Sequence, residues 1–122
     1  MKKILFVLFF VLMPFYINIA SAVFVEGLED VPLPEGVSQI ENGILSFGNE
    51  EIRFFEAYLS SENKKFSEIK KFYEETLPQM GWDKKKKTEH RIMFERDGES
   101  LEVSVESKKP LIFRLVVKSK TQ

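Results

Sequence analysis

FYEETLPQMGW, residues 72–82, is the stretch that decides the fold of this chain. Apolar residues recur at steps of three and four from Phe66 onward, which predicts one face of an amphipathic helix. Pro78 disfavours helical geometry at the residue before it, so we expect the helix to stop there. Gly81 can take the left-handed conformation that follows a last helical turn, and Trp82 is then placed to pack back onto the helix. The stretch predicts a helix end and the first anchor of a sheet, and it does not predict an active site.

The predicted helix has an apolar side and a charged side. On the charged side, Lys70–Glu74 and Lys71–Glu75 are expected to form i,i+4 pairs that contribute ~0.3 kcal/mol each. Burial of each large apolar side chain contributes about 1.5–3 kcal/mol, so packing of the apolar side outweighs these pairs. Ser61 or Ser67 is predicted to be the N-cap, because its hydroxyl can accept a free backbone N–H. The apolar side consists of Phe66, Ile69, Phe72, Tyr73, Thr76, Leu77 and Met80.

The dipeptide Asp97-Gly98 predicts a hairpin after the helix. Asp-Gly between alternating runs favours a two-residue type I′ turn, which joins residues 90–96 to residues 99–107. Apolar residues then oppose apolar residues, which supports the register that the turn sets. The predicted pairs are Arg96 with Glu99, Phe94 with Leu101, Ile92 with Val103, and His90 with Val105. Residues 111–118 are expected to form a last strand, and residues 82–86 a short strand that runs into a turn at Lys84–Lys87.

A second hairpin is predicted before the helix. Residues 43–47 and residues 51–59 are rich in strand-forming side chains and flank a turn at residues 48–50. Phe54 and Phe55 are neighbours in the second strand, so they face opposite sides of the sheet. Two interpretations are open for the ring that faces away from the core. It lines a groove or contacts a partner, or the segment at residues 23–38 covers it.

Residues 23–38, called the proline segment below, contain Pro32 and Pro34, which restrict the backbone and exclude a helix. We expect this segment to be extended and to dock on the domain through Val31, Leu33 and Val37. The chain is then divided into a cleaved signal peptide at residues 1–22, the proline segment, one domain at residues 39–118 and a tail at residues 119–122. The predicted fold is α+β: one antiparallel sheet of five to six strands, in the chain order ββ-α-ββββ, with a single helix packed across one face.

The first 22 residues predict export. Lys2 and Lys3 precede an apolar run, and Ala20-Ser21-Ala22 supplies the small residues that a signal peptidase recognises. We expect cleavage after Ala22 and a periplasmic protein that meets the membrane only during export. The alternatives are secretion, or anchoring in the inner membrane by residues 4–19. Against anchoring, this run of 16 residues is shorter than the roughly 20 that span a bilayer.

Composition excludes several classes of site. The chain has no cysteine, which excludes disulfides and thiolate metal sites and, in an exported domain, favours a bacterial envelope. Charge is unevenly placed: residues 23–62 hold nine acids and one base, and residues 63–122 hold ten acids and fifteen bases. After cleavage the net charge falls from −1 to −3, which argues against general nucleic-acid binding.

Few residues are candidates for a site. The run Lys84-Lys85-Lys86-Lys87 could contact anionic lipid or lipopolysaccharide, or it could be a solvated turn. His90, the one histidine, is placed on the apolar face of its strand. Because the chain has no cysteine and no second histidine, a zinc site or a Ser/His site lacks its parts. Carboxylates could pair for acid–base catalysis, but exposed carboxylates are rarely tuned for it. The acids considered are Glu74, Glu75, Glu99, Glu102 and Glu106. No cofactor, metal ligand or catalytic residue is predicted.

The helix end carries the pattern Phe-Tyr-x-x-x-Leu-Pro-x-x-Gly-Trp, residues 72–82. This pattern resembles one in a family of small exported bacterial proteins of unknown function, in which a proline-containing stretch (here residues 31–36) precedes a hairpin. Their later strands carry Phe-x-Arg and Leu-x-Val elements, here residues 94–96 and 101–103. The resemblance covers most of residues 31–118 and implies the fold. It implies no activity, cofactor or catalytic residue.

These features together predict an exported, non-enzymatic binding or adaptor module of the bacterial envelope. Its partner is expected to be a protein or another envelope component, of unknown identity. The alternative is a protein that binds anionic lipid or the envelope surface through Lys84–Lys87. A small carboxylate-dependent hydrolase is the third interpretation, and it requires two acids that converge in one cleft.

Overall fold

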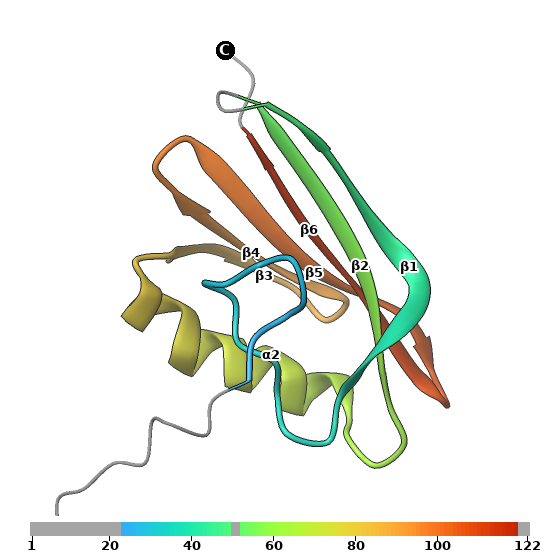
Figure 1. The fold of residues 1–122 in the computed structure, drawn as a ribbon. Coiled ribbons are helices and arrows are strands. Elements are labelled where there is room, and N and C mark those ends of the chain that lie inside the picture. Colours follow the sequence, from blue (N-terminus) through green and yellow to red (C-terminus); the bar gives the residue numbers. More distant parts are fainter. Residues whose placement is uncertain (1–22, 50–51, 120–122) are drawn as a thin grey trace, which may run out of the picture.

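A computed structural model describes residues 23–49 and 52–119 of the chain (Figure 1). Helix α2 (Phe66–Thr76), the one α-helix in these ranges, packs across one face of a six-stranded antiparallel sheet and continues as the 3-10 helix η2 (Leu77–Met80). The predicted α+β class and chain order are confirmed, whereas the predicted signal peptide and its cleavage after Ala22 lie outside the described residues. The strands are β1 (Ser38–Gly48), β2 (Arg53–Ser61), β3 (Asp83–Lys87), β4 (Arg91–Arg96), β5 (Glu99–Lys108) and β6 (Leu111–Ser119).

The strands lie side by side in the order β1-β2-β6-β5-β4-β3. The last strand in the chain, β6, therefore lies between β2 and β5 and joins the first hairpin to the rest of the sheet (Figure 1). β1 is longer than predicted, since it begins at Ser38, and its pairing with β2 is irregular between Gln39 and Ile44. No helix of the described part of the chain is long and apolar enough to cross a membrane.

The β4–β5 hairpin has the predicted register. Phe94 lies opposite Leu101, and Ile92 lies opposite Val103. Asp97 and Gly98 have φ angles of 46° and 78°, and a type I′ turn requires positive φ at both positions. The prediction for His90 was wrong. Its carbonyl accepts the N–H of Val105 at 3.0 Å, but the residue is exposed in the turn before β4, not on the apolar face of the strand.

The end of the helix is formed as predicted. Gly81 has a φ angle of 91°, in the left-handed region, and donates its N–H to the carbonyl of Pro78 at 3.1 Å. The N–H of Trp82 reaches back to the carbonyl of Leu77 at 3.1 Å, and both side chains are fully buried. This glycine cap therefore turns the chain so that Trp82 enters the core beside the helix. Met80, predicted on the apolar side, is instead partly exposed.

The start and the charged side of the helix differ from the prediction. The N-cap is Lys65 rather than Ser61 or Ser67, and the carboxylate of Glu68 accepts the N–H of Lys65 at 2.9 Å. Lys70 does not pair with Glu74: it is buried, and its Nζ donates to the carbonyls of Thr88 and Glu89 at 2.9 and 3.0 Å. The predicted Lys71–Glu75 ion pair is also not seen among the described residues, where both side chains are exposed. The two hydrogen bonds from Lys70 to carbonyls of the β3–β4 turn form inside the fold. They stabilise this position of the side chain more than an exposed ion pair on the helix would.

The core lies between the sheet and a layer that α2 and the proline segment form together. The proline segment is not extended as predicted: it turns at residues 26–27, 29–30 and 35–36, and a bridge joins Phe24 to Pro32. The turn at Gly27 brings the segment onto the ring of Phe55, because an added Cβ there would lie 2.6 Å from Cε2 of that ring. The segment also buries Val25, Leu28, Val31 and Val37 in the core. Phe55 is therefore the covered ring, and Phe54 faces the open side of the sheet.

Candidate functional site

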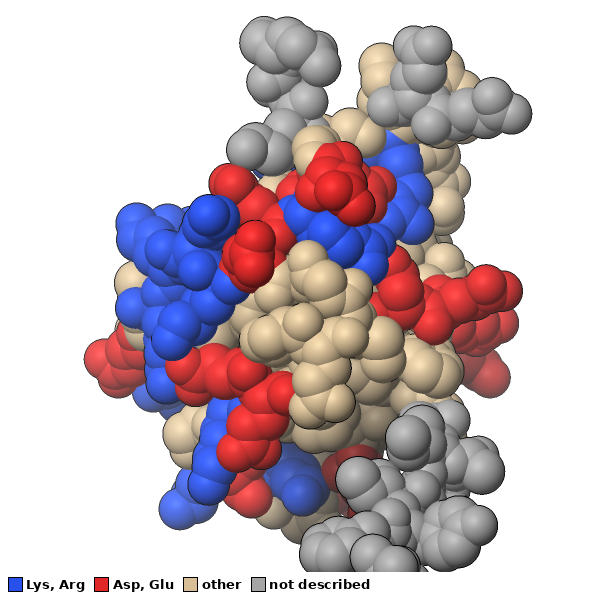
Figure 2. Space-filling view, turned by 90° about the vertical axis from the view of Figure 1, so that its left-hand side faces the viewer, with Lys and Arg blue, Asp and Glu red and all other residues tan. Residues whose placement is uncertain are grey.

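An open groove of about 610 Å³ runs between the proline segment and the C-terminal part of the helix. Its lining is mostly apolar, and Glu35, Thr76 and Gln79 add polar groups. The side of the molecule in Figure 2 has uncharged surface at its centre, and both basic and acidic side chains surround it. The groove is thus a place where apolar side chains meet solvent. The apolar lining includes Phe24, Pro32, Leu33, Val37, Phe72 and Met80.

The two walls of the groove are joined by one buried hydrogen bond. The hydroxyl of Tyr73 donates to the carbonyl of Pro32 at 2.9 Å, and Tyr73 has no exposed surface. Burial raises the pKa of Tyr73 above its usual range, so its hydroxyl keeps the proton that it donates. The ring of Phe72 stands edge-on to that of Tyr73, with centroids 5.1 Å apart. Contacts within the chain therefore hold the helix wall against the proline segment.

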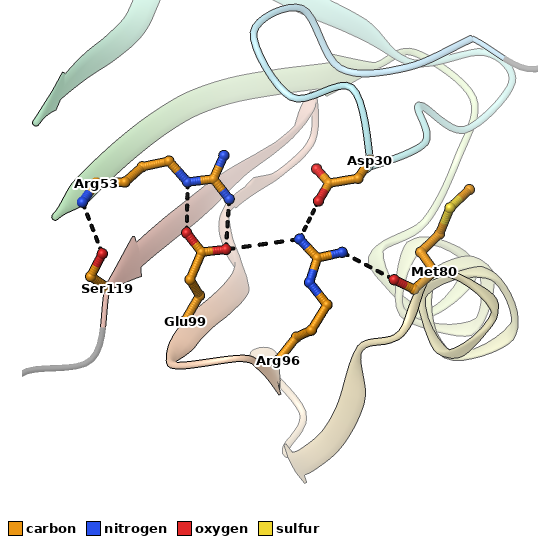
Figure 3. A network of polar contacts seen from close by, with 6 residues as sticks. All are labelled: Asp30, Arg53, Met80, Arg96, Glu99 and Ser119. Carbon is orange, nitrogen blue, oxygen red and sulfur yellow. Dashed lines mark hydrogen bonds and ion pairs between the residues drawn. The ribbon is translucent and has the colours of Figure 1, made fainter. Parts of the chain in front are cut away.

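A network of charged side chains holds the proline segment from its other side (Figure 3). Arg96, at the end of β4, pairs with Asp30 of the proline segment and donates to the carbonyl of Met80 at 3.0 Å. Its guanidinium lies 4.2 Å from the ring centroid of Trp82, where a cation–π contact forms. Arg96 thus connects three parts of the fold: the proline segment, the end of η2 and the β4–β5 hairpin.

The same network reaches the first hairpin through Glu99. Both carboxylate oxygens of Glu99 accept hydrogen bonds of 2.7 Å from Arg53 of β2, in a two-pronged pair. One of these oxygens also lies 3.8 Å from the guanidinium of Arg96, and the backbone N–H of Arg53 donates to Ser119 at 2.8 Å (Figure 3). Two acids and two bases balance in charge here. We interpret the network as a clamp that orders the sheet and the proline segment, not as a catalytic group.

The lysine run lies in strand β3 and not in a turn, which corrects the prediction. The pairing of β3 with β4 shifts between Lys84 and Lys86, which places Lys84 opposite Phe94 and Lys87 opposite Ile92, on the helix side of the sheet. Both reach the carboxylate of Glu74, at 2.9 and 2.8 Å. Their hydrogen bonds, from Lys87 and then Lys84, hold the pKa of Glu74 below its usual range. Among the described residues, only Lys85 and Lys86 of the run have no carboxylate partner.

The variant Glu74→Gln is expected to lower the free energy of unfolding by roughly 0.5–1 kcal/mol at neutral pH, since the pairs are partly exposed. The lowered pKa means that this contribution is present above the unfolded pKa of about 4.3 and is lost as the pH falls. Urea unfolding at neutral pH and near pH 3 measures the difference. Glu75→Gln is the matched control and is expected to change nothing; a loss that persists at low pH would show that the pairs are not its cause.

The other candidate carboxylates are not brought together. Glu102 pairs with Arg91 at 3.1 Å, and Glu75 and Glu106 are exposed. Glu99 belongs to the clamp described above. The described residues contain no group of three or more histidine, aspartate or glutamate side chains that could hold a metal ion. Each of the five predicted acids therefore either faces solvent or is engaged by a base of its own, an arrangement that favours a structural role.

The groove and the clamp were not predicted from the sequence. The proline segment gave a partial signal, because Val31, Leu33 and Val37 were expected to dock. Nothing in the sequence pairs Asp30 with Arg96, or Arg53 with Glu99, since these residues are far apart along the chain. Comparison of the chain with family models, with curated proteins and with solved structures finds no match. The resemblance to small exported bacterial proteins stays a prediction.

Proposed function

We propose that this chain is an exported, non-enzymatic binding module that takes an apolar segment of a partner protein into the groove between the proline segment and α2. The observation that carries the proposal is the groove itself, whose walls are apolar and open to solvent. Exposed apolar surface with polar groups at its edges is typical of sites where other proteins bind. The export predicted from residues 1–22 supports a partner in the bacterial envelope.

The construction of the groove supports binding with little rearrangement. The Tyr73–Pro32 hydrogen bond and the contacts of Arg96 hold both walls, so a ligand does not have to order them. Phe72 is only partly buried, and Met80 keeps 36% of its surface exposed. Methionine adapts its shape readily to a neighbouring surface, which suits a wall that contacts side chains of varied form.

The charges around the groove favour a protein partner over an anionic surface. Glu35 lies in the lining, which includes no lysine or arginine from the part of the chain that the structure describes. Lys84 and Lys87, half of the lysine run, already share the carboxylate of Glu74. Binding of anionic lipid by Lys84–Lys87 therefore depends mainly on Lys85 and Lys86, and liposome sedimentation of a variant with glutamine at those two positions tests it.

The test of the groove is site-specific photo-crosslinking in the intact envelope. A photoreactive phenylalanine analogue at Met80 is expected to give one discrete adduct, because the side chain lies in the groove wall and is open to contact. The same analogue at Lys71, an exposed position on α2 outside the groove lining, is the control. Mass spectrometry of the adduct identifies the partner and the segment that contacts the groove.

A charge in the groove is expected to abolish the adduct. Leu33→Asp places a carboxylate in the apolar lining and is expected to remove crosslinking from Met80, because binding would bury an unpaired charge. Ser67→Asp adds the same charge at an exposed position in the first turn of α2, where acids are favourable, and is expected to leave the adduct unchanged. Equal adducts from Met80 and Lys71, or an adduct that survives Leu33→Asp in folded protein, would refute the groove as the binding site.

A further inference from the structure

The two edges of the sheet differ in a way that matters for pairing. The edge strands are β1 and β3. β3 carries four consecutive lysines, and charged side chains, lysine above all, protect an edge from pairing with another strand. The stretch of β1 from Ile44 to Gly48 carries no charge and is exposed throughout. One edge is therefore protected and the other is open.

The open edge adjoins an exposed apolar patch. Leu45, Phe47 and Ile52 expose 50%, 60% and 61% of their surfaces. Phe47 lies opposite Phe54 in the β1–β2 pair, and their rings stack with centroids 5.0 Å apart. Because side chains alternate along a strand, all four residues lie on the face of the sheet that α2 does not cover. Contiguous apolar surface of this kind marks an interaction site.

Within the described residues, the backbone of β1 also has hydrogen-bonding groups at this edge that pair with no other strand. The N–H of Asn49 donates to the carbonyl of Ile52 at 2.6 Å, which closes the β1–β2 hairpin. Pairing is regular from Ile44 to Gly48, so hydrogen-bonded and non-hydrogen-bonded positions alternate from this point. Phe47 and Leu45 then bond to β2, while the N–H and C=O groups of Ile44, Ser46 and Gly48 point away from the sheet.

We infer that β1 pairs antiparallel with β1 of a second copy of this chain, about a two-fold axis at Ser46. In this register the outward groups of Ser46 meet those of the second copy's Ser46, and Ile44 meets the second copy's Gly48. Leu45 lies beside the second copy's Phe47 on the open face, so the two apolar patches merge. The two sheets become one, and the unprotected edges disappear from both copies.

Self-complementarity selects a second copy over other occupants. A two-fold axis brings the same patch together from both copies, and here it sets apolar side chains against apolar side chains with no charge between Ile44 and Gly48. An anionic membrane fits less well, because Glu50 and Glu51 follow this stretch directly in the sequence. The inference does not depend on the groove, which is lined by other residues.

A single cysteine at the axis gives a direct test, since the chain has none of its own. Opposed hydrogen-bonded residues have Cα atoms about 5.5 Å apart, within the range of a disulfide, so Ser46→Cys is expected to form a covalent dimer on mild oxidation. Ser38→Cys lies exposed in the same strand but far from the axis, and it is expected to stay monomeric. Equal crosslinking of the two variants would overturn the proposed register.

Light scattering on the protein as purified, over a wide concentration range, tests the dimer itself. The wild type is expected to dimerise, and Ser46→Pro to raise the dissociation constant by about ten-fold or more, because it removes an outward N–H at the centre of the pairing. The far-ultraviolet circular dichroism of this variant shows whether it still folds, and Phe47→Lys provides a second variant with an intact backbone. A wild type that stays monomeric, including one that instead sediments with zwitterionic vesicles, would overturn the inference.

Discussion

Trp82→Ala is expected to destabilise the protein by about 3–5 kcal/mol, the loss typical of a large buried aromatic side chain. Trp82 is fully buried, follows the glycine cap of the helix and lies under the guanidinium of Arg96. The variant therefore opens a cavity and also removes the contact that orients Arg96 toward Asp30 and Met80. Urea or thermal unfolding measures the loss, with the midpoint expected to fall sharply.

Trp82→Phe separates packing from hydrogen bonding. Nε1 of Trp82 is buried and has no hydrogen-bond partner among the described residues, so phenylalanine removes no hydrogen bond of the indole. We expect this variant to cost less than half of what alanine costs, because most of the ring volume is kept. If the two variants were equally unstable, the packing of Trp82 between helix and hairpin would not be the source of its contribution.

Stability is expected to fall steeply above about pH 10 because of Tyr73. In the unfolded chain this hydroxyl ionises near pH 10, whereas burial raises the pKa of Tyr73 in the fold well above that value. The unfolded state then binds fewer protons than the folded state, so the free energy of unfolding decreases by up to about 1.4 kcal/mol per pH unit. The contribution of Tyr73 to the free energy of unfolding is fully present below the pKa of tyrosine in the unfolded chain. It is lost as the pH rises toward the pKa of Tyr73 in the folded chain.

Tyr73→Phe is expected to be less stable than the wild type at neutral pH and more stable than the wild type at high pH. At neutral pH it costs roughly 1–2 kcal/mol, because the carbonyl of Pro32 loses its buried donor. By about pH 12 the wild type has lost more than this through ionisation, so the variant becomes the more stable protein. Tyr58→Phe, at a half-buried position in β2, is the control for general alkaline effects. Parallel pH profiles for Tyr73→Phe and the wild type would contradict this account of Tyr73.

Prediction from the sequence was most accurate for local structures, which residues close to one another in the sequence determine. The Asp97-Gly98 turn fixes the β4–β5 register through the conformations of two residues, and this prediction was confirmed. The helix end at Pro78 and Gly81 is local in the same sense. In both cases the side chains that decide the geometry lie within a few residues of the structure they decide.

Predictions failed where a distant partner decides the outcome. The side chain of Lys70 does not pair with Glu74, because it donates to the carbonyls of Thr88 and Glu89, which lie close to it only in the folded chain. The proline segment folds into turns that bury its apolar side chains and bring Gly27 onto the ring of Phe55, which lies in a distant part of the sequence. The groove is what remains between this segment and the helix, so its shape could not be read from either part of the sequence alone.

The position of β6 in the middle of the sheet determines when the sheet can form during synthesis of the chain. β2 has no partner on one side until β6 arrives, because Phe54 to Ser61 pair with Lys118 to Leu111. Residues 111–119 must therefore leave the ribosome before the first hairpin can join the sheet. Closing this long loop is slow compared with forming the neighbouring hairpins. A chain built in this way stays incompletely folded until residues 111–119 have been made.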